Sequence, residues 1–331
     1  MKEGQANSSL FLLFTMKKIL AIQMDPVESI NPRTDTTMLL GLEALERGYD
    51  VYCYQPKDLI FLNGAITARA RQVTFHKNPD AYFTAGGWQI INLREADVVL
   101  MRQDPPFNME YITATHLLEM LQPDVLVVND PFHVRNAPEK LFMFRFPQFL
   151  APTLISRDVQ TIEDFLGTHQ DIVLKPLYGY AGQSVFRVKK GDSNFHALLE
   201  MFFGSSNEPI IAQLFIPEIK TMDKRIIVIN GKVTAIYGRV PAKDDIRANM
   251  RVGGTGIKIE ASERDIRIGE TVGKELVKRG ILLAGLDVIG DYLTEINVTC
   301  PTGLVGSNAL YNLKQESVFW DAVESKLKKR A

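Results

Sequence analysis

The segment 284–303 carries the residues with the clearest chemistry in this chain. It contains two short apolar runs joined by a turn, with Asp287 in the first run and Glu295 and Asn297 in the second. Residues two apart on a strand share a face, so Glu295 and Asn297 point the same way. Three oxygen ligands on one face of a hairpin suit a hard cation such as Mg²⁺, which completes its shell with water and substrate phosphates. The segment therefore predicts nucleotide chemistry, and an ordinary hairpin with exposed acidic residues is the alternative.

The register of this hairpin decides whether Asp287 joins the other two residues. A two-residue loop would place Asp287 opposite Thr294, on the wrong face. A three-residue loop at 290–292 would place it opposite Glu295 instead. Three-residue hairpin loops usually carry a bulge, so we expect a three-residue loop and a bulge here.

An upstream segment that combines a lysine with glycines is a candidate phosphate site. Lys175 ends an apolar run and precedes Gly179 and Gly182. Glycine adopts positive φ readily, so the backbone N–H groups of such a turn can face an anion beside the lysine. Neither a P-loop nor a G-x-G-x-x-G motif occurs in the chain. The alternative is a β-hairpin with a glycine turn.

Further polar residues fit around a nucleotide, although each also fits a structural role. Arg225 and Arg239 could clamp phosphates or carboxylates by bidentate hydrogen bonds, or form surface ion pairs. The polar, glycine-rich segment 242–256 has the length of a lid, with simple disorder as the alternative. Asp25 and Arg102 each follow a strand-like run, and ligands of open α/β sheets bind at the carboxyl ends of strands.

The elements that must position these residues follow from the hydrophobic pattern. Short continuous apolar runs, typical of buried parallel strands, alternate in the first part of the chain with runs of helical spacing. The pattern predicts strands over 19–24, 51–54, 97–101, 124–128, 172–176, 185–188, 210–215, 225–230 and 233–239, and helices over 34–47, 109–121, 195–203 and 263–279.

These elements divide the chain into predicted domains. Residues 17–135 form a small α/β domain with a parallel sheet. A capping box at 136–139 predicts the start of a new helix and marks a boundary. We assign residues 1–16 to an N-terminal extension, 136–217 to a second unit and 218–331 to a third.

Composition excludes several classes of function. A chain of 331 residues has room for two or three domains. Its net charge of -1 argues against nucleic-acid binding driven by bulk charge. The apolar run 10–14 is too short to cross a membrane. Two cysteines without a disulfide or zinc pattern fit a reducing cytoplasm.

In this order the pieces resemble the ATP-grasp superfamily, whose members clamp ATP between two α+β subdomains. More closely, residues 17–325 resemble bacterial-type glutathione synthetases. The matching phrases are MDP at 24–26, R-x-DPPF at 102–107, N-x-x-EKLF at 136–142, LKP-x-x-G at 174–179, DKR at 223–225, NMRVGGTG at 249–256 and LDVIGDYLTEINVTCPTG at 286–303. The resemblance implies an N-terminal parallel-sheet α/β domain followed by a two-subdomain ATP-grasp fold, with 136–217 as the lid subdomain and 218–331 as the catalytic one.

The resemblance also implies an activity: ATP-dependent ligation of γ-glutamylcysteine and glycine to glutathione, through a cysteinyl acylphosphate. The implied cofactors are ATP and Mg²⁺ or Mn²⁺, and the implied state is a cytoplasmic homo-oligomer, a tetramer, with no nucleic-acid or membrane partner. The implied site residues are Arg225, Arg239 and Asn249 for catalysis; Lys140, Lys175, Gly179, Tyr180, Gly182, Gln183, Ser184, Gln213, Leu214, Phe215 and Asp223 for ATP; Asp287, Glu295 and Asn297 for the metal; and Asp25, Arg102, Thr299 and Pro301 for the other substrates.

Two positions depart from the family pattern. The phosphate loop usually has adjacent glycines, whereas 179–182 reads Gly-Tyr-Ala-Gly, from which we expect only altered loop mobility. Gln103 stands where a lysine is usual, so any contact that this lysine makes through its charge is in doubt in this chain. Three alternatives stay open: a ligase of the same fold with another dipeptide or amino-acid pair, a non-catalytic ATP-binding regulatory protein of this fold, and a kinase. The full set of charged residues counts against the regulatory protein, because ATP binding alone would not need it.

Overall fold

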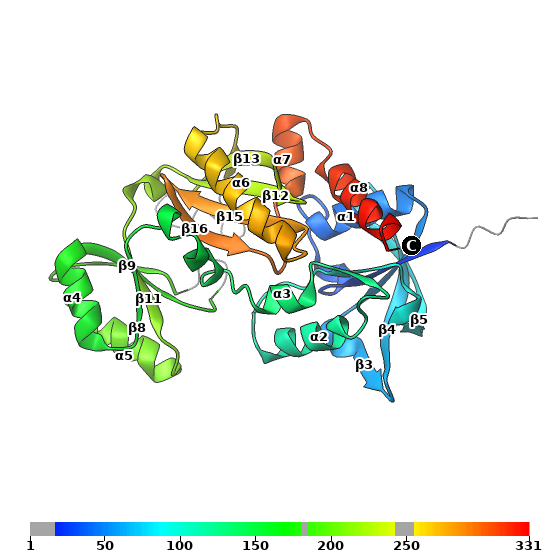
Figure 1. Ribbon diagram of the computed structural model, residues 1–331, viewed down its shortest axis with the longest axis horizontal. Coiled ribbons are helices and arrows are strands. Elements are labelled where there is room, and N and C mark those ends of the chain that lie inside the picture. The colour runs from blue at the N-terminus through cyan, green and yellow to red at the C-terminus, as the bar shows by residue number, and fades with distance from the viewer. Residues whose placement is uncertain (1–16, 180–183, 242–254, 331) are drawn as a thin grey trace, which may run out of the picture.

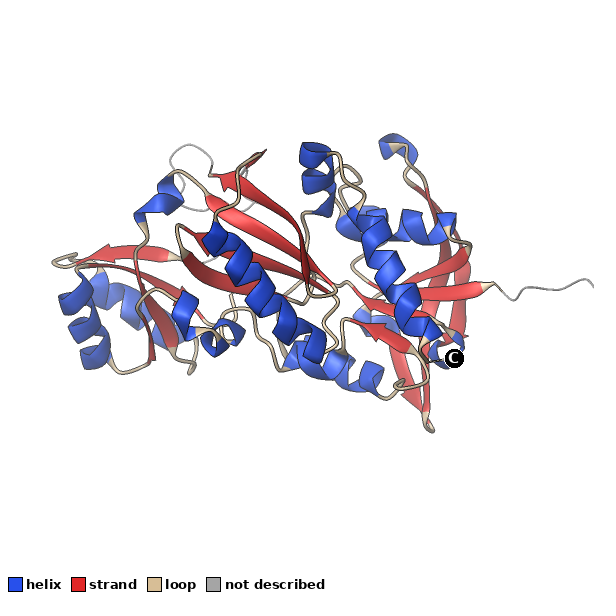
Figure 2. Cartoon of the chain, turned by 45° about the horizontal axis from the view of Figure 1, so that its top comes forward, coloured by secondary structure: helices blue, strands red, loops and turns tan. Residues whose placement is uncertain are grey.

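The structure is a computed structural model that describes residues 17–179, 184–241 and 255–330 (Figure 1). The described residues form three β-sheets of seven, four and five strands. The five-stranded sheet lies between the other two along the long axis of the molecule (Figure 1). Helices pack against the faces of the sheets (Figure 2).

The seven-stranded sheet comes from the first part of the chain. Its order is β3-β4-β2-β1-β6-β7, with β5 paired to β4; β1, β2, β6 and β7 run parallel. The predicted strands and helices of this region are confirmed, but the antiparallel strands β3, β4 and β5 had no predicted counterpart. The bounds are β1 (Lys18–Gln23), α1 (Thr36–Glu46), β2 (Tyr49–Tyr54), β3 (Leu59–Leu62), β4 (Ala65–Phe75), β5 (Phe83–Asn92), β6 (Val98–Met101), α2 (Met109–Glu119), β7 (Leu126–Val128) and α3 (Pro131–Arg135).

The helix predicted to begin at the 136–139 capping box is wrong. Asn136 instead ends α3, and its side-chain amide donates back to the carbonyl of Phe132 at 2.7 Å. The carboxylate of Glu139 accepts a hydrogen bond from Thr299 at 2.8 Å and so does not close a capping box. Two 3₁₀ turns, Phe142–Arg145 and Pro147–Phe149, follow in place of an α-helix. A contact 160 residues away in sequence overrides the local signal.

The four-stranded antiparallel sheet has the order β10-β9-β11-β8 and its own core. Apolar side chains of α4 and α5, including Ile162 and Phe202, pack with Leu174 and Val188 of the sheet. The predicted strands and helix are confirmed. The bounds are β8 (Thr153–Ser156), α4 (Val159–His169), β9 (Asp171–Pro176), β10 (Phe186–Lys189), α5 (Phe195–Ser205) and β11 (Ile210–Leu214).

The five-stranded antiparallel sheet has the order β14-β13-β12-β15-β16. Helix α6 packs on β12 and β13, where Gly273 brings its backbone against Gly231. The bounds are β12 (Asp223–Ile229), β13 (Lys232–Val240), β14 (Thr255–Ile257), α6 (Glu263–Lys278), β15 (Leu283–Ile289), β16 (Tyr292–Asn297), α7 (Leu304–Tyr311) and α8 (Gln315–Lys328).

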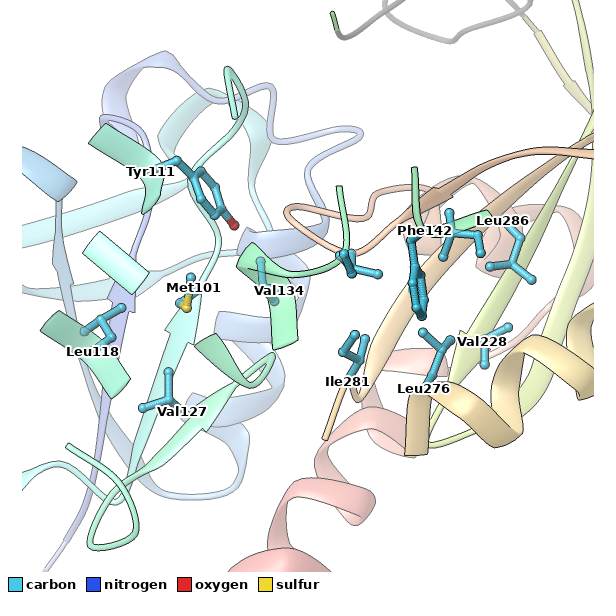
Figure 3. Packing of buried hydrophobic residues seen from close by; sticks show 14 of the residues in the cluster. Met101, Tyr111, Leu118, Val127, Val134, Phe142, Val228, Leu276, Ile281 and Leu286 are labelled. Carbon is cyan, nitrogen blue, oxygen red and sulfur yellow. The ribbon is translucent and has the colours of Figure 1, made fainter. Parts of the chain in front are cut away.

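The seven- and five-stranded sheets share their cores. One buried cluster joins Met101 and Leu118 of the first region to Leu276 and Leu286 of the last (Figure 3). A second cluster includes Trp320 of α8, whose indole N–H donates to the carbonyl of Leu40 in α1 at 2.8 Å. Helices α1 and α8 therefore belong to one packed unit. None of the helices in the described part of the chain combines the length and apolar character needed to span a membrane.

Candidate active site

The β15–β16 hairpin carries Asp287 on its first strand and Glu295 on its second. Asp287 pairs with Glu295, as predicted. The loop, however, has two residues rather than three, because Ile289 pairs with Tyr292. The predicted bulge is present but lies within the strands, where Thr294 is the extra residue, and it shifts the register between Asp287 and Val288. The bulge restores the pairing that a two-residue loop alone would have lost.

Two aspartates and two arginines form a buried charge cluster on β12, β13 and β15. Arg225 binds Asp287 through two hydrogen bonds, Nε to Oδ1 at 2.6 Å and Nη2 to Oδ2 at 3.2 Å. Arg239 binds Asp223 in the same bidentate manner, at 2.7 and 2.5 Å, and its Nη2 also lies 3.1 Å from Asp287 Oδ2. All four residues are buried. The register places them side by side, since Arg225 pairs with Asp287 and Asp223 with Arg239.

The balance of charge in this cluster sets the protonation of its acids. Burial works to raise the pKa of Asp287, but Arg225 and Arg239 outweigh it and hold the pKa below its ordinary value. Burial dominates at Asp223 and raises its pKa, with Arg239 opposing. Because Asp287 stays ionised, it fixes both guanidinium groups in position. The arginines are then preorganised to meet negative charge in the site.

Two buried lysines approach the same hairpin from the four-stranded sheet and the segment before it. Lys140 Nζ lies 3.5 Å from Glu295 Oε1 and donates to the carbonyl of Gly179. Lys175 Nζ donates to Gln213 Oε1 at 3.1 Å. Burial lowers the pKa of Lys175 to about 8, and the negative charge of Glu295 partly opposes this shift. A buried cation paired with a neutral amide is a ready partner for phosphate.

The oxygen donors on the hairpin fit a hard divalent cation. The side chain of Glu295 is 28% exposed, with Lys140 as its ion-pair partner. The amide nitrogen of Asn297 donates to Gly285 O at 3.2 Å and to Asp287 Oδ2 at 3.3 Å, so its amide oxygen is the group that can accept or bind a cation. The described residues contain no cluster of three His, Cys, Asp or Glu side chains that could hold a metal. Two carboxylates and an amide, completed by phosphate and water, are nonetheless a donor set that Mg²⁺ accepts.

Glu139 contacts the residues of the hairpin, although the sequence predicted only a capping role for it. It accepts hydrogen bonds from Thr299 Oγ1 through its carboxylate at 2.8 Å and from Ile296 N through its carbonyl at 3.0 Å. Burial, reinforced by Glu295, raises its pKa to about 7. Its place directly before Lys140, within the matched EKLF phrase, was the only available signal.

The seven-stranded sheet contributes its carboxyl edge to the site. Arg102 donates from Nε to Thr37 Oγ1 at 3.1 Å and from Nη1 to Pro301 O at 3.0 Å. Asp25 accepts a hydrogen bond from the backbone of Asp104 at 2.8 Å. The structure thus brings the predicted substrate residues Arg102 and Pro301 into contact across 199 residues of sequence.

Three other residues predicted to bind ATP, Leu214, Phe215 and Ser184, are also described by the structure. The backbone N–H groups of Leu214 and Phe215 donate to Pro152 and Asp171, and Arg187 stacks 3.7 Å above the Phe215 ring. Ser184 adopts a positive φ of 55°. Four predicted residues lie outside the described part of the chain: Tyr180, Gly182, Gln183 and Asn249.

The fold resembles that of solved ATP-grasp ligases. A RiPP-associated ATP-grasp ligase from Chryseobacterium gregarium matches with a TM-score of 0.60 and 16% identity, over 94% of this chain and 97% of that one. D-cycloserine synthetase DcsG matches with a TM-score of 0.64 and 13% identity, over 92% and 99%. At such identities the likeness establishes the fold alone, and it confirms the predicted fold class.

Sequence relatives define the family more narrowly. The model of the prokaryotic glutathione synthetase N-terminal domain matches residues 18–135, and that of the ATP-grasp domain of the same family matches 139–312. Glutathione synthetases from Bradyrhizobium diazoefficiens and Brucella melitensis are 46% and 44% identical, over 94% and 93% of this chain and 99% and 98% of their own lengths. The chain belongs to the prokaryotic glutathione synthetase family, and the predicted ATP-dependent ligase class is confirmed.

Proposed function

We propose that this protein joins γ-glutamylcysteine to glycine and makes glutathione at the expense of ATP. The observation that carries this proposal is the buried Asp287–Arg225–Arg239 cluster beside the hairpin, whose Glu295 pairs with the buried Lys140. Relatives named glutathione synthetase support the particular substrates, because they match over nearly the full length of this chain.

The chemistry explains why such a cluster is needed. A carboxylate is a poor electrophile, so the γ-phosphoryl group of ATP is first transferred to the cysteinyl carboxylate. The amine of glycine then attacks the acyl carbon; the C–N bond forms, the bond to the phosphate oxygen breaks, and the amine loses its proton. Arg225 and Arg239 neutralise charge on the transferring group, and the site mainly positions the reactants. Exclusion of water protects the acylphosphate from hydrolysis.

The nucleotide and metal assignments form part of this proposal. Lys140 and Lys175 contact phosphates, and residues 179–184 cover them. Residues 213–215 receive adenine, and Asp223 receives the ribose. Glu295 and Asn297, with Asp287, would hold Mg²⁺ or Mn²⁺, which supplies positive charge to the ATP phosphates when bound.

The remaining assignments concern substrates and organisation. Asp25, Arg102, Thr299 and Pro301 hold the dipeptide and glycine, and Asn249 acts at the phosphoryl-transfer centre. The proposed units are 17–135 for substrate binding, 136–217 as the lid and 218–331 as the catalytic subdomain, after an extension at 1–16. That the protein is a cytoplasmic tetramer stays a prediction by resemblance. Light scattering of the purified protein would test the oligomeric state.

Amine-dependent phosphate release tests the proposed function directly. Purified protein with ATP, Mg²⁺ and γ-glutamylcysteine should release ADP and phosphate in equal amounts once glycine is added, and Glu295→Gln should not. A kinase would release ADP without phosphate. A ligase of another specificity would respond to a different amino acid or dipeptide, and a regulatory protein would release neither product.

A further inference from the structure

Tyr237 stands in the same row of side chains as the charge cluster, although the proposed function gives it no role. In the five-stranded sheet Tyr237 pairs with Arg225, Arg225 with Asp287, and Asp287 with Glu295. Residues directly opposite each other on antiparallel strands share a face of the sheet. One row of side chains therefore runs across β13, β12, β15 and β16, with Tyr237 at one end and Glu295 at the other.

The hydroxyl of Tyr237 reaches the segment that follows the hairpin. A Cβ at Gly303, which has a φ of 111°, would collide with this hydroxyl, so the phenol lies directly against the backbone of Gly303. The carbonyl of the preceding residue, Thr302, accepts a hydrogen bond from Arg225 Nη1 at 3.2 Å. The hydroxyl and one guanidinium group of the cluster therefore meet the same two-residue segment.

The phenol of Tyr237 is a neutral hydrogen-bond donor among charged groups. Burial raises its pKa. The two arginines of the cluster oppose this shift and the two aspartates add to it, so all four charges act on this one O–H group. Because the pKa lies above its ordinary value, the hydroxyl keeps its proton at neutral pH and can donate it in a hydrogen bond.

This hydroxyl has no hydrogen-bond partner among the described residues, in contrast to that of Tyr311, which donates to Ile236 O at 2.7 Å. It is not one of the fully enclosed hydroxyls that lack a partner, such as that of Tyr49. Part of the 2% of Tyr237 that stays exposed is therefore the hydroxyl itself. Leaving a buried polar group unpaired costs about 1–3 kcal/mol, so a hydroxyl at this place in the site points to a ligand.

The order of the row indicates which reacting group this hydroxyl meets. In the proposed function the metal and the nucleotide phosphates lie at the Glu295 end, where the buried Lys140 is 3.5 Å from that carboxylate. In phosphoryl transfer the attacking and leaving oxygens lie roughly in line on opposite sides of phosphorus. The carboxylate that accepts the phosphoryl group therefore lies on the side of Arg225 away from Glu295, which is the side of Tyr237.

We propose that Tyr237 is a further catalytic residue, whose O–H donates a hydrogen bond to the acyl oxygen of the cysteinyl acylphosphate. When the amine of glycine bonds to the acyl carbon, the π electrons of the carbonyl move to this oxygen. Their return breaks the bond to the phosphate oxygen, and the amine proton leaves with the phosphate. A donor held ready for such an oxyanion accelerates acyl transfer. This inference rests on the proposed function and adds one residue to its mechanism.

Tyr237→Phe tests the proposal, because it removes the hydroxyl and keeps the packed ring. We expect kcat for glycine-dependent phosphate release to fall about 10- to 100-fold, as for one lost hydrogen bond to a charged group. KM for ATP and for γ-glutamylcysteine should stay close to the wild type, because the bond strengthens only as the oxyanion forms. Thermal melting should give a Tm equal to or above that of the wild type, since the hydroxyl that is removed is unpaired in the free protein.

Tyr49→Phe is the matched control. Tyr49 is also 2% exposed, belongs to the same hydrophobic cluster as Tyr237, and has a hydroxyl without a partner among the described residues. This variant should keep the wild-type kcat, because Tyr49 lies on β2 of the seven-stranded sheet.

Three results would overturn the assignment of Tyr237. They are a folded Tyr237→Phe with the wild-type kcat, a fall of equal size in Tyr49→Phe, and a loss of activity that appears only as a raised KM. A fall in Tm together with activity would likewise assign the hydroxyl a structural role and contradict the proposal. A wild type that releases no phosphate with glycine would instead overturn the proposed function.

Discussion

Replacing Asp287 by asparagine tests whether this residue serves the arginines or only a metal. Its carboxylate accepts hydrogen bonds from Arg225 at 2.6 and 3.2 Å and lies 3.1 Å from Arg239. The cluster holds two guanidinium groups and two carboxylates, so Asp287→Asn leaves one buried positive charge uncompensated. Breaking a buried ion pair from one side costs about 3–5 kcal/mol. At about 2.1 cal/mol/K of unfolding entropy per residue, the 331-residue chain should lose about 4–7 °C in Tm.

The matched variant is Glu295→Gln on the facing strand. The side chain of Glu295 is 28% exposed and lies 3.5 Å from Lys140, a longer and more solvated ion pair than that of Asp287, so its removal should cost less than that of Asp287. Both variants should lose ligase activity, but Asp287→Asn should lose more stability. Thermal melting without ATP or metal, followed by phosphate release, measures both effects. If Asp287→Asn melts like the wild type while losing activity, Asp287 acts mainly as a metal ligand and the reasoning from the arginines is refuted.

Three further predictions concern single groups. The kcat/KM for ATP should fall as pH rises through about 8, because the buried Lys175 loses its proton there. In Lys175→Arg this fall should disappear. A wild-type profile that is flat from pH about 7 to about 9 would contradict the prediction. Burial raises the pKa of Glu139 from 4.5 to about 7, so between these pH values the folded protein holds a proton that the unfolded chain releases. The free energy of unfolding of the ligand-free protein should therefore fall as pH rises across that interval. Denaturant titrations of Glu139→Gln should lack this pH dependence. In Gly273→Ala the new Cβ would lie 2.3 Å from Gly231 O and should cost about 1–3 kcal/mol, whereas Gly306→Ala, with open space around it, should melt like the wild type.

The sequence predicted well those elements whose signal is local. The buried parallel strands are continuous apolar runs, and α6 has both helical spacing and a capping box at Ser262. Strand β5 escaped prediction because it is exposed along almost its whole length, so its residues follow no alternation. The helix expected from Asn136 failed for the opposite reason, since a good local signal lost to a tertiary hydrogen bond at Glu139.

The bonding of the candidate site was not predictable from the sequence. Residue order alone predicted that Asp287, Glu295 and Lys175 belong to one site. No local pattern shows that Arg225 would occupy both oxygens of Asp287, because that contact joins residues 62 positions apart. The hairpin shows the same limit. The position of its turn could be predicted from Gly290, but the two-residue length of the loop and the place of the bulge at Thr294 depend on how the strands pair.

The packing of Trp320 on α1 has a consequence for how the protein is made. Its hydrogen bond to Leu40 joins residues 280 positions apart. At about 5–20 residues per second, a ribosome needs roughly 14–56 s to make the intervening chain. Throughout that time the face of the first sheet that α8 will cover stays bare, whereas the four-stranded sheet has all of its own core once residue 214 has been made. Nascent chains should therefore complete their middle module first and depend longest on chaperones at their N-terminal sheet.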